Sequence, residues 1–215
     1  MKAGLCSVVI LISGRGSNLQ AILDQAASGD LPIDIRAVIS NRPEAAGLAL
    51  AEAAGVPTES LDHRQFASRE DFDRALQQTI DRFQPQLVVL AGFMRILTAD
   101  FVHHYRGRLL NIHPSLLPKY QGLDTHRRVL ENGEREHGVS VHFVTEELDG
   151  GPVIAQSRVN VLPDDSPEQL AARVLEKEHR LYPAVIRWFA EGRLRLAGDQ
   201  VIFDGQAQTE PVCIE

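Results

Sequence analysis

Apolar runs and apolar stripes alternate along the first half of the chain. Residues 7–13 (SVVILIS) are apolar on both faces, which predicts a fully buried strand. The stripe that follows has the spacing of one helix face and consists of Leu19, Ile22, Leu23 and Ala26. Ser17 or Asn18 is the candidate cap of that helix. The same patterns predict further strands at 35–40, 58–61 and 87–91 and helices at 44–54 and 69–83.

This alternation predicts a parallel sheet with helices on both faces, whereas the second half of the chain is less regular. Strands are predicted at 108–112, 137–145 and 153–161, followed by a hairpin at 194–203 that turns at Gly198-Asp199. The fold class is therefore α/β, with a mostly parallel sheet and antiparallel strands in the C-terminal half. Without a repeat or linker, the sequence predicts one domain over 1–215, with halves at 1–105 and 106–215.

A long helix is predicted to begin after Ser166. Ser166 is its cap, Pro167 takes the first helical position, and Gln169 completes a capping box. Pro183 is expected to kink this helix, because proline removes one backbone hydrogen bond.

Composition and charge exclude several classes of protein. The net charge of -7 argues against nonspecific nucleic-acid binding, which depends on clustered Lys and Arg. The 2 cysteines are too few for a disulfide framework and fit a reducing compartment. The apolar run at 8–12 is short for a signal peptide, and no stretch reaches the ~20 apolar residues of a membrane span. We therefore predict a soluble, cytoplasmic protein with no membrane partner.

The glycine-rich residues 14–19 (GRGSNL) join the first strand to the first helix, where backbone N–H groups favour an anion such as phosphate. A dinucleotide fingerprint needs a third glycine, and Leu19 stands there instead. No Asp or Glu stands at the end of the second strand, although Arg42 could bind the 2′-phosphate of NADP. A phosphate site for a smaller ligand is the preferred interpretation, and a tight turn without ligand is the alternative.

Asn111 and His113 are two residues apart at the predicted carboxyl end of a strand, so both side chains point to one face. An amide can stabilise an oxyanion and an imidazole can move a proton, which together suit acyl transfer. A hydrogen-bonded turn at a strand end is an equally good interpretation of this spacing. Asp149 precedes Gly150-Gly151-Pro152 and could favour a protonated His113, although a plain turn explains it better by itself.

The remaining histidines do not have metal-ligand spacing. His103 and His104 are adjacent and diverge on a helix, while His137 and His142 are five apart in a strand and face opposite sides. No paired Cys-x-x-Cys or His-Glu-x-x-His pattern occurs. The sequence predicts no metal site.

Four stretches together resemble the glycinamide ribonucleotide formyltransferase family of purine synthesis. They are ISGRGSNLQ at 12–20, LAGFMRIL at 90–97, GRLLNIHPSLLPKY at 107–120 and EHGVSVHFVTEELDGGPVI at 136–154. The resemblance runs from about Val8 to Gly205, nearly the whole chain. It implies a three-layer Rossmann-like formyltransferase fold and two small-molecule substrates, glycinamide ribonucleotide and the formyl donor 10-formyltetrahydrofolate. A monomer or weak homodimer is expected.

The resemblance also implies residue roles. The ribonucleotide site of the family matches Gly16, Ser17, Asn18 and Glu178. The folate-binding site of the family matches Arg69, Met94, Arg95, Ile96, Leu97, Asn111, Thr145, Glu146, Glu147, Leu148 and Asp149. His113 matches the catalytic acid, Asn111 its oxyanion partner, and Asp149 the carboxylate that tunes His113, which reverses the plain-turn interpretation.

Three positions depart from the family pattern. Gln121 replaces a usual Pro, Asp124 a usual His, and Arg15 a frequent Asn. Asp124 is expected to change local hydrogen bonding without being catalytic, and Arg15 adds a cation that should not harm phosphate binding.

The rival functions include a 10-formyltetrahydrofolate hydrolase, which usually carries an added N-terminal domain, and methionyl-tRNA formyltransferase, which carries a C-terminal nucleic-acid-binding domain. Outside this group, an NADP oxidoreductase lacks its third glycine here. A nucleotide-binding regulatory module would not need the set of Asn111, His113 and Asp149.

Overall fold

The computed structural model describes residues 4–215, and the chain divides into two compact units between Leu110 and Asn111. This division lies close to the predicted border between residues 105 and 106. Within residues 4–215, no helix combines the length and apolar character needed to cross a membrane.

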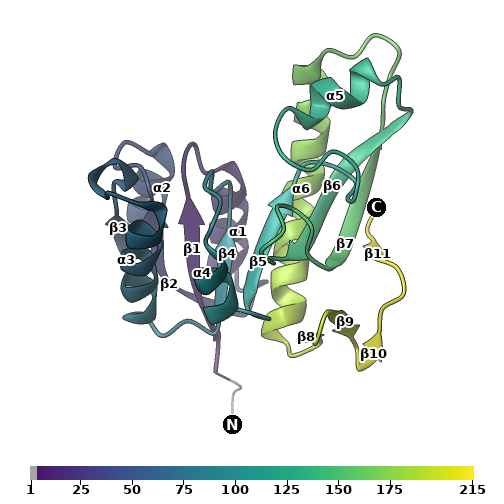
Figure 1. Cartoon of the computed structure of the whole chain (residues 1–215). Helices are drawn as coiled ribbons and strands as arrows, with labels where there is room; N and C mark the ends of the chain where they lie inside the picture. Colours follow the sequence, from purple (N-terminus) through teal and green to yellow (C-terminus); the bar gives the residue numbers. More distant parts are fainter. Residues whose placement is uncertain (1–3) are drawn as a thin grey trace. The chain divides into compact units, whose positions relative to one another are not determined.

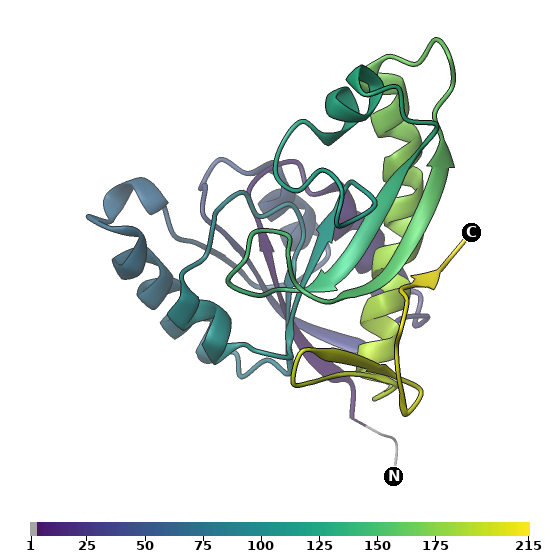
Figure 2. The same cartoon turned by 45° about the vertical axis from the view of Figure 1, so that its right-hand side comes forward.

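The unit up to Leu110 is a parallel α/β layer structure. Its strand order is β4-β1-β2-β3, and every pairing among these strands is parallel. The strands are β1 (Cys6–Ile12), β2 (Ile33–Ser40), β3 (Thr58–Ser60) and β4 (Leu87–Leu90). The helices are α1 (Ser17–Ala27), α2 (Ala46–Ala53), α3 (Arg69–Asp81) and α4 (Ala99–His104), with a short 3₁₀ turn, η1 (His63–Gln65). Helix α1 packs against α2, and α3 packs against α4, on opposite sides of the strands (Figure 2).

The apolar patterns explain these elements. All residues of β1 are buried, as expected of a central parallel strand. In α3, Phe72, Leu76 and Ile80 form the inward stripe and have no exposed surface. Ser68 caps this helix by accepting from the Asp71 N–H at 3.1 Å.

The unit from Asn111 onward contains the antiparallel strands. Strand β6 (Glu136–Phe143) pairs antiparallel with β7 (Val153–Asn160), and β5 (Leu109–His113) neighbours β6. The long helix α6 (Pro167–Ala190) packs against β6 and β7, and α5 (Thr125–Glu131) contacts α6 (Figure 1). Strand β11 (Val212–Cys213) joins β7 in parallel, and β8 (Leu194–Ala197), β9 (Gln200–Phe203) and β10 (Gln206–Ala207) form a small separate sheet.

The predicted fold class is confirmed: parallel strands with flanking helices precede an antiparallel region. The predicted capping box of Ser166 and Gln169 is present, and α6 continues through Pro183 as one helix. The predicted cap of the first helix is wrong. Gly16 occupies the cap position in the left-handed conformation, with φ of 82°, so Ser17 and Asn18 lie inside the first turn and neither caps it.

Candidate active site

The turn after β1, residues 14–18, is hereafter called the phosphate turn after the ligand that the sequence predicts for it. A Cβ on Gly16 would lie 2.9 Å from the Cα of Gly47, and the Gly47 N–H donates to the Gly14 carbonyl at 3.0 Å. Glycine at position 16 therefore serves both the positive φ and the close approach of α2. The first N–H groups of any helix lack partners within it, so the start of α1 provides an electropositive backbone end for an anion.

Residues 93–97, hereafter the 93–97 segment, follow β4, the parallel neighbour of β1. Met94 and Ile96 are large apolar side chains with exposed fractions of 64% and 55%. Two buried side chains hold the ends of the segment: Ser13 Oγ accepts from Met94 N–H at 2.7 Å, and Asp73 Oδ2 accepts from Thr98 N–H at 2.6 Å. The segment is thus an exposed apolar ledge on a fixed backbone, which suits a flat aromatic ligand.

Asn111, His113 and Asp149 come together in the second unit. Asp149 Oδ2 lies 3.3 Å from His113 Nδ1, and Asn111 Nδ2 donates to Asp149 Oδ1 at 3.4 Å. The side chains of His113 and Asp149 are only 8% and 9% exposed. Both members of the pair on β5 reach the same carboxylate, so the predicted shared face of Asn111 and His113 is confirmed.

His142 on β6 is a fourth member that the sequence did not identify. Its Nδ1 lies 3.0 Å from the Phe143 carbonyl, which can only accept, so Nδ1 carries the hydrogen. Burial lowers the pKa of His142, which leaves the ring neutral and its Nε2 an acceptor for Asn111 Nδ2 at 3.1 Å. His142 and Asp149 thus both accept from the Asn111 amide nitrogen and fix its orientation.

The loop between β6 and β7 aims the Asp149 carboxylate. Asp149 itself has a positive φ of 50°. A Cβ on Gly151 would lie 1.9 Å from the Phe143 carbonyl oxygen, so the loop closes on the end of β6 only with glycine there. The Phe143 N–H donates to the Pro152 carbonyl at 3.1 Å and seals the base of the loop.

The segment after β5 covers the same cluster. His113 Nε2 lies 2.9 Å from the Tyr120 carbonyl, and the Gly122 N–H donates to Asp149 Oδ2 at 2.9 Å. Asp124 is the N-cap residue just before α5, and its side chain, which is 65% exposed, pairs with Arg127 at 2.9 Å. The departure at Asp124 is therefore accommodated by a surface ion pair.

The other predicted site residues lie in several elements. Glu178 is buried on α6 with 8% exposure, and Arg69 begins α3, where it pairs with Glu70 at 3.9 Å. Arg95 lies over the Phe72 ring at 4.7 Å. The predicted folate residues of the β6–β7 loop range from half-buried to exposed and are Thr145, Glu146, Glu147 and Leu148.

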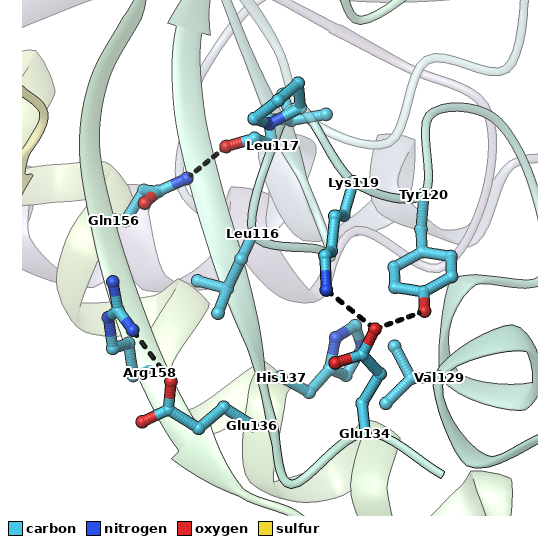
Figure 3. Close-up of a pocket in the computed structure, with 11 residues that line it drawn as sticks. Leu116, Leu117, Lys119, Tyr120, Val129, Glu134, Glu136, His137, Gln156 and Arg158 are labelled. Atoms are coloured by element: carbon cyan, nitrogen blue, oxygen red, sulfur yellow. Dashed lines mark hydrogen bonds and ion pairs between the residues drawn. The ribbon is translucent and has the colours of Figure 1, made fainter. Parts of the chain in front are cut away.

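A cavity of about 300 Å³ lies elsewhere in the second unit and contains none of the cluster residues (Figure 3). Its charged side chains are paired with one another: Glu134 accepts from Lys119 at 2.7 Å and from the Tyr120 hydroxyl at 2.8 Å. Arg158 donates to Glu136 at 2.7 Å. With these ions already paired, the cavity offers no free charge to a ligand. Among residues 4–215, no group of three His, Cys, Asp or Glu side chains could hold a metal ion.

Comparisons with known proteins identify the family of the chain. The family described as formyl transferase matches residues 6–186, most of the chain, which defines the class of the protein. The chain is 56% identical to the phosphoribosylglycinamide formyltransferase of Escherichia coli over 200 residues, which covers 93% of this chain and 94% of the relative. The Haemophilus influenzae enzyme of the same name is 46% identical over the same coverage. The chain therefore belongs to the phosphoribosylglycinamide formyltransferase family, enzymes of purine biosynthesis.

A solved structure supports the same assignment. The phosphoribosylglycinamide formyltransferase of Coxiella burnetii, solved in complex with CHES, superposes with a TM-score of 0.94 at 53% identity. It covers 98% of this chain and 100% of its own. A relative of different organisation is the chicken trifunctional purine biosynthetic protein adenosine-3, 44% identical, of which the match covers 19%.

Proposed function

We propose that the enzyme transfers the formyl group of 10-formyltetrahydrofolate to the amine of glycinamide ribonucleotide. The observation that carries this proposal is the buried Asp149 carboxylate, which contacts both His113 Nδ1 at 3.3 Å and Asn111 Nδ2 at 3.4 Å. Relatives named phosphoribosylglycinamide formyltransferase match over nearly the whole chain and support the choice of substrate. No metal takes part, and the enzyme acts as a monomer or weak homodimer.

The two substrates use different surfaces. Gly16, Ser17 and Asn18 of the phosphate turn hold the ribonucleotide phosphate, and Glu178 contacts the same substrate. The folate lies against the 93–97 segment, and the remaining folate contacts come from Arg69, Asn111 and Thr145 to Asp149.

The reaction needs no covalent enzyme intermediate. The neutral glycinamide amine attacks the formyl carbon, and the carbonyl electron pair moves to oxygen. The protonated His113 stabilises this oxyanion, and Asn111 Nδ2 does so once its longer bond, the one to Asp149 at 3.4 Å, gives up its hydrogen. Collapse then breaks the bond between the formyl carbon and N10, N10 gains a proton, and the attacking amine loses one, so charge balances.

His113 is suited to deliver that proton. Both of its ring nitrogens face acceptor oxygens, from Asp149 at 3.3 Å and from the Tyr120 carbonyl at 2.9 Å, an environment that fits a ring protonated on both. Because Asp149 holds Nδ1, the transferred proton is the one on Nε2. The Tyr120 carbonyl must release Nε2 when the formyl donor binds.

The test follows 10-formyltetrahydrofolate by absorbance, with and without glycinamide ribonucleotide, and identifies the formylated product. Conversion that depends on the ribonucleotide supports the proposal. Conversion without it indicates the hydrolase, and no conversion beside an active control enzyme refutes formyl transfer.

Two variants test the residue roles. His113→Ala should lower kcat by about 10²–10⁴-fold, the usual contribution of a positioned acid, while the exposed control His103→Ala keeps kcat. Asp149→Asn should lower kcat by about 10²-fold and shift its pH profile, because it removes the charge beside Nδ1. Near-normal turnover of His113→Ala, or an unchanged profile for Asp149→Asn, contradicts the assigned role.

A further inference from the structure

A buried serine lies between the two predicted binding segments of the first unit. Ser13 directly follows β1 and is 3% exposed. Its N–H donates to the Gly92 carbonyl at 3.1 Å, and its Oγ accepts from the Met94 N–H at 2.7 Å. Ser13 is therefore bonded twice to the stretch after β4, while its next residue, Gly14, opens the phosphate turn.

The hydroxyl of Ser13 has a fixed direction. A serine hydroxyl has one hydrogen to donate, and here it goes to Asn41 Oδ1 at 2.5 Å. Asn41 is itself 2% exposed, so its amide is enclosed beside Ser13. Because the Ser13 hydroxyl donates its hydrogen to Asn41, its oxygen is left to accept from the Met94 N–H.

The two segments that Ser13 adjoins are held in different ways. On the side of the phosphate turn, Gly47 binds the Gly14 carbonyl, and α2 leaves no room for a Cβ at Gly16. On the other side, the 93–97 segment belongs to no helix or strand and depends on side chains for its position. Ser13 is linked to Gly14 by the peptide bond and to Met94 by a hydrogen bond, so a shift of either residue acts on Ser13 directly.

We propose that Ser13 is a positioning residue that couples the phosphate turn to the 93–97 segment. When the ribonucleotide orders the phosphate turn, Ser13 Oγ is held in place. Ser13 then holds the 93–97 segment, where the folate binds, through Met94. Coupling between two sites is reciprocal, so folate on the ledge improves ribonucleotide binding by the same factor. This inference rests on the proposed function for the identity of the two ligands.

The chain supplies a matched control at the other end of β1. Ser7 is also buried, at 8% exposure; its Oγ donates to the Gln84 carbonyl at 3.2 Å and accepts from the Gln86 N–H at 3.0 Å. Ser7→Ala and Ser13→Ala thus remove comparable hydrogen bonds from one strand, but only Ser13 adjoins the predicted binding segments.

Steady-state kinetics provide the first measurement. Loss of the Ser13 hydroxyl should raise the KM for both substrates by about five- to tenfold, the effect of one buried hydrogen bond, with kcat changed by less than about twofold. Ser7→Ala should leave both KM values unchanged while lowering the melting temperature to a similar extent. Unchanged KM values in Ser13→Ala, or an equal rise in Ser7→Ala, overturn the proposal.

Hydrogen exchange provides a second measurement that does not require turnover. Without ligand, Ser13→Ala should speed amide exchange in both the phosphate turn and the 93–97 segment, whereas Ser7→Ala should speed neither. Glycinamide ribonucleotide alone should slow exchange in both segments of the unsubstituted protein, but only in the turn of Ser13→Ala. If the unsubstituted protein forms no formylated product, the proposed function fails, and exchange without ligand still decides the coupling: a change in only one segment refutes it.

Discussion

The pair of histidines that joins α5 to β6 predicts a loss of stability in mild acid. His126 Nδ1 and His137 Nε2 are 2.9 Å apart, so one nitrogen donates and the other must be unprotonated. His137 is 1% exposed, and burial lowers its pKa to about 4; burial also lowers the pKa of His126. Protonation of both facing nitrogens would break this hydrogen bond in a buried site.

The size and sign of the effect follow from His137. Lowering a pKa from 6.5 to about 4 corresponds to about 3 kcal/mol, because each pKa unit is worth about 1.4 kcal/mol. In the unfolded state His137 binds its proton below about pH 6.5, the ordinary pKa, whereas in the folded state it does so only near pH 4. Between these two pH values the unfolded state therefore holds more protons. His137 therefore leaves the free energy of unfolding unchanged above pH 6.5 and lowers it as the pH drops towards 4.

His137→Gln keeps a polar side chain that does not titrate, and it isolates this contribution. Urea unfolding at about pH 7.5 and pH 4.5 should show that the unsubstituted protein loses about 2 kcal/mol more than His137→Gln between the two conditions. The control His103→Gln removes an exposed histidine and should keep the full loss. Equal losses in the unsubstituted protein and His137→Gln would refute the reasoning.

Two further predictions concern residues that hold loops in place, the buried Asp73 and the loop glycine Gly151. Burial raises the pKa of Asp73, so the folded protein holds its proton to higher pH and loses stability as the pH rises past the ordinary aspartate range. Asp73→Asn, which can still accept from Thr98, should be at least as stable as the unsubstituted protein at pH 7 in urea unfolding; a clear loss there contradicts the prediction. Gly151→Ala should lower the melting temperature sharply and abolish turnover, because its Cβ would lie 1.9 Å from the Phe143 oxygen; the matched Gly4→Ala, with nothing within 4 Å, should do neither.

The sequence predicted the elements whose side chains repeat with a clear period. The buried run of β1, the stripe of α3 and the capping box of α6 each depend on neighbours within one element, so a local pattern was sufficient. The hairpin of β8 and β9 turns at Gly198-Asp199 as predicted, for the same reason.

Several short elements were not predicted, although the three-residue strand β3 was. Helix α4 spans only 6 residues and α5 only 7, too few for an apolar stripe to repeat. Strand β11 is 2 residues long and pairs with β7, which is distant in sequence. The cap of α1 was missed because the signal at Gly16 is a left-handed backbone and a contact with Gly47, neither of which depends on a capping side chain.

Within the candidate site, the spacing of Asn111 and His113 predicted their shared face, but their partners lie far along the chain. His142 was considered with His137 only as a metal ligand and was rejected, so its actual partner was missed: His137 contacts His126, whereas His142 contacts Asn111. A spacing of five cannot indicate those partners, because they come from other elements.

Asp149 illustrates why a turn motif can belong to a site. By itself, Asp-Gly-Gly-Pro is an ordinary turn, and its backbone does have turn geometry, with a φ of 50° at Asp149. That geometry is also what directs the carboxylate: Gly151 lets the loop close on Phe143, and Gly122 donates an N–H to Asp149 at 2.9 Å. The turn chemistry and the proposed catalytic chemistry therefore use the same residues. A sequence can reveal the first, whereas the second requires His113 at 3.3 Å, which only the fold supplies.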